Sequence, residues 1–141
     1  MKRVKLNSIL CILVILCVLV SAASAAGSDE DQIQPYFIRI SSLSTNFSVS
    51  SSGYADCYGR VELYKTSDTA ELTMELQRSS DQSNWGTIKD WTASGKCTVE
   101  LDKGWYVASG YYYRIHITAD VYSSSGSLVD SATKDSVVAW H

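Results

Sequence analysis

Histidine is scarce in this sequence, which weakens the case for several kinds of catalysis. Only His116 and His141 occur in 141 residues. His116 falls on the polar side of an alternating segment and His141 ends the sequence, so neither has a recognisable catalytic or metal-ligating partner. The serines lie mostly in turns, and none stands in the Gly-x-Ser-x-Gly pattern of a hydrolase nucleophile. We therefore predict no catalytic residues, no metal site and no cofactor.

Long apolar runs are also missing. The longest, residues 9–20, would form a helix of about 18 Å, well short of the ~30 Å hydrocarbon core of a bilayer. Three positive charges precede it and the cleavage pattern Ala23-Ser24-Ala25 follows it, which is typical of a secretory signal peptide. We predict that residues 1–25 are removed and that the protein is secreted. An uncleaved anchor and a lipoprotein are the alternatives, and the leucines before Cys11 and Cys17 disfavour the lipoprotein.

Basic residues are outnumbered once the predicted signal peptide is removed. Nine Lys and Arg then face fifteen Asp and Glu, a net charge near −6. This balance repels phosphate backbones and anionic lipid, which disfavours binding to nucleic acid or to a membrane. Residues 26–34 hold three consecutive acids and no apolar periodicity, so we predict a flexible acidic tether. Residues 35–141 are long enough for one domain with its own core.

Beyond residue 36, apolar residues alternate with polar ones, and no segment has convincing helical spacing. In residues 111–122, tyrosine, isoleucine, alanine and valine at odd positions alternate with residues such as Arg114, His116 and Asp120. Residues 54–65, 70–77 and 97–102 alternate similarly, which predicts strands with one buried face. Weaker signals predict strands at 85–92, at 128–139 and at 36–49, the last with a bulge or change of sheet at residues 41–42.

Stretches rich in serine and glycine separate these segments. They lie at residues 50–53, 79–84, 93–95 and 123–127. Seven or so short strands divided in this way predict an all-β fold with a single antiparallel two-sheet sandwich. A small β-barrel is the alternative.

A late segment resembles a known corner of β-sandwich proteins. Gly110-Tyr111-Tyr112-Tyr113-Arg114-Ile115 is similar to the penultimate strand of immunoglobulin-like and fibronectin type III domains. In those domains a tyrosine hydroxyl bonds back to the backbone at the strand's corner, and the resemblance assigns that role to Tyr111 or Tyr113.

The chain from residue 26 onward also resembles a family of small exported proteins of Gram-positive bacteria, uncharacterised in function. The resemblance is carried by Leu76-Gln77 and the two tryptophans Trp85 and Trp91, by the serine- and glycine-rich turns, and by Ser109-Gly110-Tyr111. It implies an immunoglobulin-like exported β-sandwich and no known activity. One departure from antibody domains is clear, because residues 111–122 contain no cysteine for the usual inter-sheet disulfide.

Cys57 and Cys97 are the two cysteines outside the predicted signal peptide, and both fall on the inward side of their segments. In an exported protein such a pair is typical of a disulfide. In the usual sandwich order their strands are neighbours, so we predict a Cys57–Cys97 disulfide. The alternative is two buried free thiols.

Aromatic residues are abundant, and most of them must belong to the core. We expect Trp85, Ile88 and Trp91 to cover one end of it. Tyr54, Tyr58 and Tyr64 instead share the outer side of one predicted strand, where rings can stack on sugars or anchor a protein. The alternative is ordinary cross-strand packing of tyrosines on an exposed sheet face.

These features together favour binding over catalysis. We expect a secreted, monomeric, non-catalytic bacterial module that binds a cell-wall glycan, another polysaccharide or a surface partner through its outward tyrosines. The alternative is a secreted effector or inhibitor that acts on an extracellular protein through the loops at residues 79–84 and 123–127.

Overall fold

The computed structural model describes residues 38–141, which form eight strands and no helix. The predicted signal peptide at residues 1–25 and the acidic tether at 26–34 lie outside the described residues. The strands are β1 (Ile40–Val49), β2 (Tyr54–Leu63), β3 (Thr69–Ser79), β4 (Gly86–Lys96), β5 (Thr98–Tyr106), β6 (Tyr112–Tyr122), β7 (Leu128–Asp135) and β8 (Ala139–Trp140).

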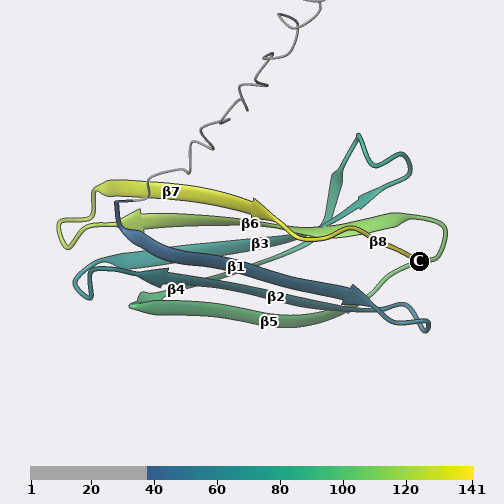
Figure 1. Cartoon of the computed structure of the whole chain (residues 1–141), viewed down its shortest axis with the longest axis horizontal. Helices are drawn as coiled ribbons and strands as arrows, with labels where there is room; N and C mark the ends of the chain where they lie inside the picture. Colours follow the sequence, from purple (N-terminus) through teal and green to yellow (C-terminus); the bar gives the residue numbers. More distant parts are fainter. Residues whose placement is uncertain (1–37) are drawn as a thin grey trace, which may run out of the picture. The chain divides into compact units, whose positions relative to one another are not determined.

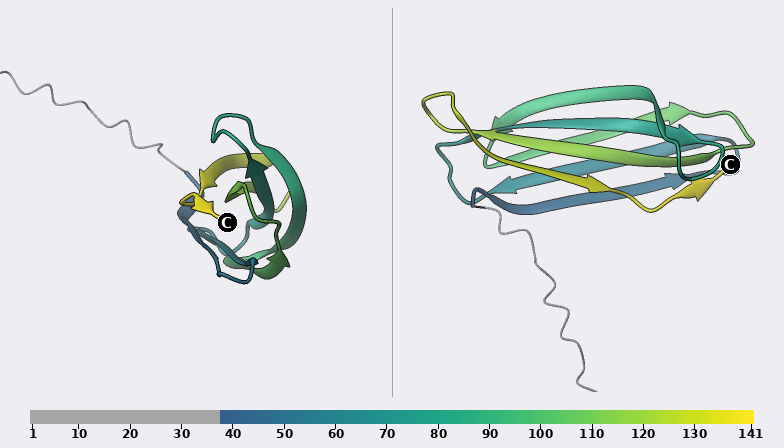
Figure 2. Two further views of the ribbon diagram at one scale, coloured as in Figure 1. Left: turned by 90° about the vertical axis from the view of Figure 1, so that its right-hand side faces the viewer. Right: turned by 90° about the horizontal axis from the view of Figure 1, so that it is seen from above.

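Two antiparallel sheets form a sandwich, which confirms the predicted fold class (Figure 1). One sheet has the order β1-β2-β5, and the other has the order β4-β3-β6-β7 with the short β8 paired to the start of β6. Figure 2 shows the same strands from one end and from above. Because the strands divide into two sheets, the alternative of a small closed barrel is wrong. In an immunoglobulin constant domain the fourth strand joins the first, second and fifth, whereas here β4 pairs with β3.

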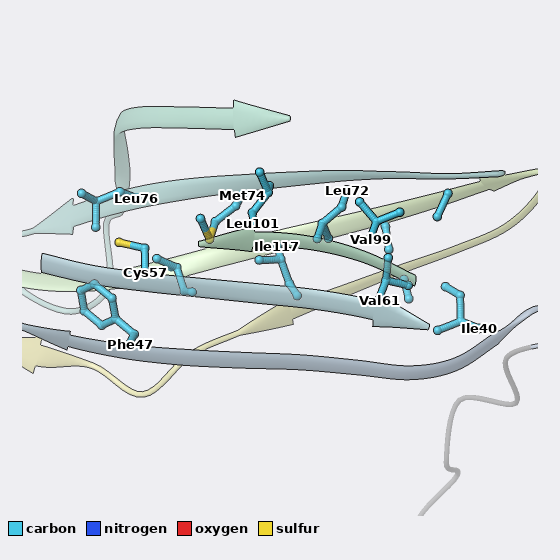
Figure 3. Packing of buried hydrophobic residues seen from close by; sticks show 14 of the residues in the cluster. Ile40, Phe47, Cys57, Val61, Leu72, Met74, Leu76, Val99, Leu101 and Ile117 are labelled. Carbon is cyan, nitrogen blue, oxygen red and sulfur yellow. The ribbon is translucent and has the colours of Figure 1, made fainter. Parts of the chain in front are cut away.

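The core lies between the sheets and follows the predicted alternation. From Ala70 to Leu76 on β3 and from Tyr113 to Val121 on β6, every second side chain is buried and its neighbours are exposed or half-buried. Figure 3 shows side chains from the two sheets pointing toward one another. The largest fully buried side chains are Tyr113, Leu72, Met74, Leu76, Ile115, Ile117, Val61, Val121 and Cys57.

The irregularity predicted at residues 41–42 is a shift in the pairing of β1 with β2, located between Ile40 and Ser42. At the same point β1 contacts the other sheet. The carboxylate of Asp130 on β7 accepts hydrogen bonds from the backbone N–H groups of Arg39, at 2.8 Å, and of Ile40, at 3.3 Å. The shift therefore marks the place where one edge of the sandwich is closed.

Two predicted boundaries are wrong. Residues 93–95 form no turn, because they continue β4 in register with β3, and the chain passes to β5 through Cys97 alone. The predicted strand at 128–139 is two strands, β7 and β8. It is interrupted at Ser136, whose backbone N–H donates to the Ile115 carbonyl at 2.9 Å and whose hydroxyl accepts from the Ile115 N–H at 3.0 Å.

The tyrosine corner implied by the resemblance is present and belongs to Tyr113. Its hydroxyl donates a 2.7 Å hydrogen bond to the carbonyl oxygen of Ala108, in the loop before β6. Burial of the ring raises the pKa of Tyr113, so the hydroxyl stays protonated and remains a donor. Tyr111 instead lies half-buried beside Tyr113, with the guanidinium group of Arg78 4.4 Å from its ring centre.

Candidate functional site

The tyrosines singled out from the sequence divide into two groups. Tyr54 and Tyr58 lie on β2 and point to the outer face of the β1-β2-β5 sheet. Tyr64 lies beyond the end of β2, where its backbone N–H donates to the carbonyl of Arg39 at 2.9 Å. Its side chain is 67% exposed. Tyr64 follows Tyr54 by ten residues, however, so it lies at the opposite end of β2. Tyr64 is therefore separate from the site around Tyr54.

Tyr106 on β5 joins Tyr54 and was missed by the sequence reasoning. The two residues are cross-strand partners, with ring centres 5.2 Å apart and ring planes at 70°, and their side chains are 42% and 72% exposed. The Tyr54 ring lies over Gly104, where a Cβ atom would come within 1.8 Å of the Tyr54 hydroxyl oxygen. The alternation in the sequence could have indicated it, because Gly104 and Tyr106 are at every second position after the outward Glu100.

Charged groups on this face fall into a paired and an unpaired set. At the end of the sheet near the β2–β3 connection, Arg60 lies 3.3 Å from Glu100 and also contacts Glu62. The hydroxyl of Tyr58 donates to Glu100 at 3.2 Å. Within residues 38–141, the side chains of Asp56 and Asp102 make no hydrogen bond or ion pair. We call the following set the tyrosine face: Tyr54, Asp56, Tyr58, Asp102, Gly104 and Tyr106.

A second aromatic group lies at the neighbouring edge, where β4 and β5 approach each other. The ammonium group of Lys89 on β4 is 5.9 Å from the ring centre of Trp91 and 5.3 Å from that of Trp105 on β5. Lys89 pairs with Leu76 and Trp105 with Ala55, so both residues lie on the inward side of edge strands. An inward lysine on an edge strand hinders edge-to-edge pairing with another chain, and a structural role explains this group.

Trp85 does not cover the core, contrary to prediction. It lies on the outer face of the β4-β3-β6-β7 sheet, where the guanidinium carbon of Arg114 is 4.3 Å from the centre of its ring. Arg114 also donates to Gln77 at 2.9 Å and to Asp135 at 2.8 Å, and Asp135 contacts His116 at 2.5 Å. Each of these polar side chains is bonded to another member of the network. We therefore interpret the network as structural, holding neighbouring strands of the sheet together on its surface. Of the other two residues predicted to cover the core, Trp91 packs against it and Ile88 is exposed.

The predicted Cys57–Cys97 disulfide is wrong, and both cysteines are free. Their strands are neighbours, as expected, but Cys57 faces Lys103 in the register, while the carbonyl of Cys97 accepts from Leu63. Six residues of strand separate these two positions, about 20 Å, whereas a disulfide needs Cα atoms within about 7 Å. The alternative of two buried thiols is also wrong, because Cys97 is exposed at the sharp link between β4 and β5.

The thiol of Cys57 is buried among core side chains. Its burial, assisted by the neighbouring Asp56 carboxylate, raises its pKa to about 12. The thiolate is the reactive form of cysteine, so Cys57 is inert at neutral pH.

Metal ligands do not gather on the described part of the chain. Within residues 38–141, no group of three or more His, Cys, Asp or Glu side chains is placed to hold a metal ion. The same residues include no helix long and apolar enough to cross a membrane.

No protein-family model matches the chain, and a search of curated proteins finds no match. The tyrosine face is the strongest candidate site on chemical grounds.

Proposed function

We propose that the protein is an exported, non-catalytic module that binds a polysaccharide of a cell wall or other surface through the tyrosine face. One observation carries the proposal: Tyr54 and Tyr106, on adjacent strands, present two exposed rings in contact with each other. Large apolar side chains are normally buried, so adjacent exposed rings indicate a binding surface. The resemblance to small exported Gram-positive proteins supports the same setting.

The chemistry of the tyrosine face suits a sugar chain. Aromatic rings offer broad apolar area with few rotatable bonds, so covering them with the apolar face of a sugar ring costs little conformational entropy. The free carboxylates of Asp56 and Asp102 can accept hydrogen bonds from sugar hydroxyls beside the rings. Gly104, the cross-strand partner of Asp56, has no side chain, so the Tyr54 ring can lie over it on the outer face.

Co-sedimentation of the purified protein with bacterial cell walls and insoluble polysaccharides tests this function. We expect saturable retention that falls at least tenfold in Tyr54→Ala and in Tyr106→Ala. Tyr64→Ala is the matched control, because Tyr64 is as exposed as Tyr106 but lies outside the tyrosine face. Absence of retention on any glycan, or equal losses in all three variants, would overturn the proposal.

A second candidate function rests on the loop between β3 and β4, which projects from the sheets (Figure 1). Asp81 organises it by accepting hydrogen bonds from the backbone N–H groups of Ser83, at 2.9 Å, and Asn84, at 2.8 Å. Trp85 donates its indole N–H to the Gln82 carbonyl at 3.2 Å. A preorganised projecting loop suits insertion into a protein partner, as in an effector or inhibitor.

Chemical crosslinking in culture supernatant separates the two candidates. A protein partner would give a discrete heteromeric species that Asp81→Ala abolishes and Tyr54→Ala leaves intact. The glycan-binding function predicts the opposite sensitivity and requires no stoichiometric protein partner.

A further inference from the structure

We propose that the glycan bound by the tyrosine face carries free, protonated amino groups. This inference rests on the proposed function and specifies the chemical class of its ligand. It is drawn from the charges on the outer face of the β1-β2-β5 sheet.

The outward residues of this sheet have a strong excess of acid. The outward positions of β1 opposite β2 hold only the neutral Ser42, Ser44, Asn46 and Ser48. On β2 and β5 the outward charged residues are Asp56, Arg60, Glu62, Glu100 and Asp102. Four carboxylates thus share the face with a single guanidinium group.

The single guanidinium group, that of Arg60, does not pair with the carboxylates next to the tyrosine rings. Arg60 contacts both Glu62 and Glu100, which partly neutralises one end of the face. Asp56 and Asp102, at the other end, have no cationic partner among the described residues. Lys103 directly follows Asp102 in the sequence but pairs with Cys57, so it belongs to the inward parity of β5.

The two unpaired carboxylates lie among the tyrosines. Asp56 is opposite Gly104, and Asp102 is opposite Tyr58, so the two aspartates are diagonal neighbours, about 7–8 Å apart between their backbones. The Tyr54–Tyr106 pair forms the adjoining row. Along β2 the outward residues therefore alternate between tyrosine and aspartate, and β5 adds Asp102 and Tyr106 to the same three rows.

This combination favours a cation. Aromatic ring faces attract ammonium groups, and two like charges on one small surface repel each other until a counter-charge arrives. A neutral sugar would leave that repulsion in place, and an anionic glycan would increase it. Each exposed contact is weak in water, but a polymer with an amine on each repeat brings several to the face at a high effective concentration.

Binding to two chemically related solids tests the inference. Chitosan beads present a polymer of free amino sugars, and chitin beads present the same polymer with its amines acetylated. At a pH that protonates the amines, we expect retention on chitosan to be at least tenfold tighter than on chitin. We expect Asp56→Asn/Asp102→Asn to remove most of that preference.

The control is a double variant with the same change in net charge on the other sheet. Glu71 and Asp120 are cross-strand partners on the outer face of β3 and β6, so Glu71→Gln/Asp120→Asn neutralises a comparable acidic pair. It should retain chitosan binding. Equal losses in the two double variants would show attraction to overall charge and overturn the inference.

The remaining outcomes separate the inference from the function on which it rests. Equal binding to chitin and chitosan, lost from both in Tyr54→Ala, would overturn the amine preference and leave glycan binding in place. Binding to neither solid, nor to cell walls, would overturn both.

Discussion

Tyr54 lies across Gly104 of the neighbouring strand, and the two residues fit only because position 104 has no side chain. A Cβ atom there would be 1.8 Å from the hydroxyl oxygen of Tyr54 and 2.3 Å from the adjacent ring carbon. Gly104 therefore permits the orientation of the ring that contacts Tyr106. The arrangement depends on two residues that are fifty positions apart in the sequence and are both exposed.

Gly104→Ala should displace the Tyr54 ring without unfolding the domain. Gly104 is exposed in β5 and has no positive φ, so the backbone accepts alanine and the added methyl group acts on the ring alone. We expect glycan retention to fall about as far as in Tyr54→Ala, with an unchanged circular dichroism spectrum and unfolding midpoint.

Gly86→Ala provides the control for this substitution. Gly86 is also exposed in a strand, and a Cβ atom there would meet nothing within 4 Å. It should leave retention unchanged. Full retention in Gly104→Ala would mean that the orientation of Tyr54 is irrelevant to binding.

The two cysteines should differ sharply in reactivity. Cys97 is exposed and free, while Cys57 is buried with its pKa raised to about 12. A maleimide reagent at neutral pH should therefore label Cys97 in the native protein, and label Cys57 only after denaturation. Mass spectrometry of the labelled peptides measures both sites. Protection of both cysteines in denaturant without reductant would instead indicate a disulfide.

The contrast between the cysteines shows what alternation encodes. Period two in residues 111–122 and 70–77 correctly predicts which side chains are buried, because each strand has one face on the core. It also correctly predicts that Cys57 faces inward. It does not determine register, and Cys97 lies six positions along the sheet from Cys57 because β4 and β5 are joined by a one-residue link.

The candidate site was partly predictable for the same reason. Parity places Tyr54 and Tyr58 on one outer face, but adding Tyr106 required the pairing of β2 with β5, which brings together residues 52 positions apart. In the sequence, Tyr64 continues the outward alternation that begins at Tyr54. In the structure β2 ends at Leu63, so the expected line of three tyrosines is broken there.

Removing the corner hydroxyl should destabilise the fold measurably. Tyr113→Phe keeps the buried ring and loses the 2.7 Å hydrogen bond to Ala108. A typical hydrogen bond contributes about 1 kcal/mol to the free energy of unfolding, and we expect a loss of that size in urea denaturation. Tyr111→Phe is the control, because the Tyr111 hydroxyl makes no hydrogen bond within residues 38–141. A larger loss in Tyr111→Phe would contradict the assignment of the corner.

The loop at residues 79–85 should contribute a pH-dependent part of the stability through Asp81. Hydrogen bonds from the Asn84 backbone and side chain, and then from the Ser83 backbone and the Ser79 hydroxyl, hold the pKa of Asp81 well below its usual 3.8. A carboxyl whose pKa is lower in the folded state stabilises the protein above its unfolded-state pKa, and this stabilisation declines as the pH falls through the folded-state value.

Asp81→Asn should therefore be less stable than the unsubstituted protein at neutral pH, with a difference that narrows steadily as the pH falls below about 4. Urea denaturation midpoints across this range measure the effect. Asp90→Asn is the matched control, because Asp90 is an exposed acid on β4 with no side-chain partner among the described residues. Its difference from the unsubstituted protein should be small at every pH. A constant difference for Asp81→Asn would show that the hydrogen bonds do not depend on the charge, since asparagine offers an acceptor oxygen at the same position.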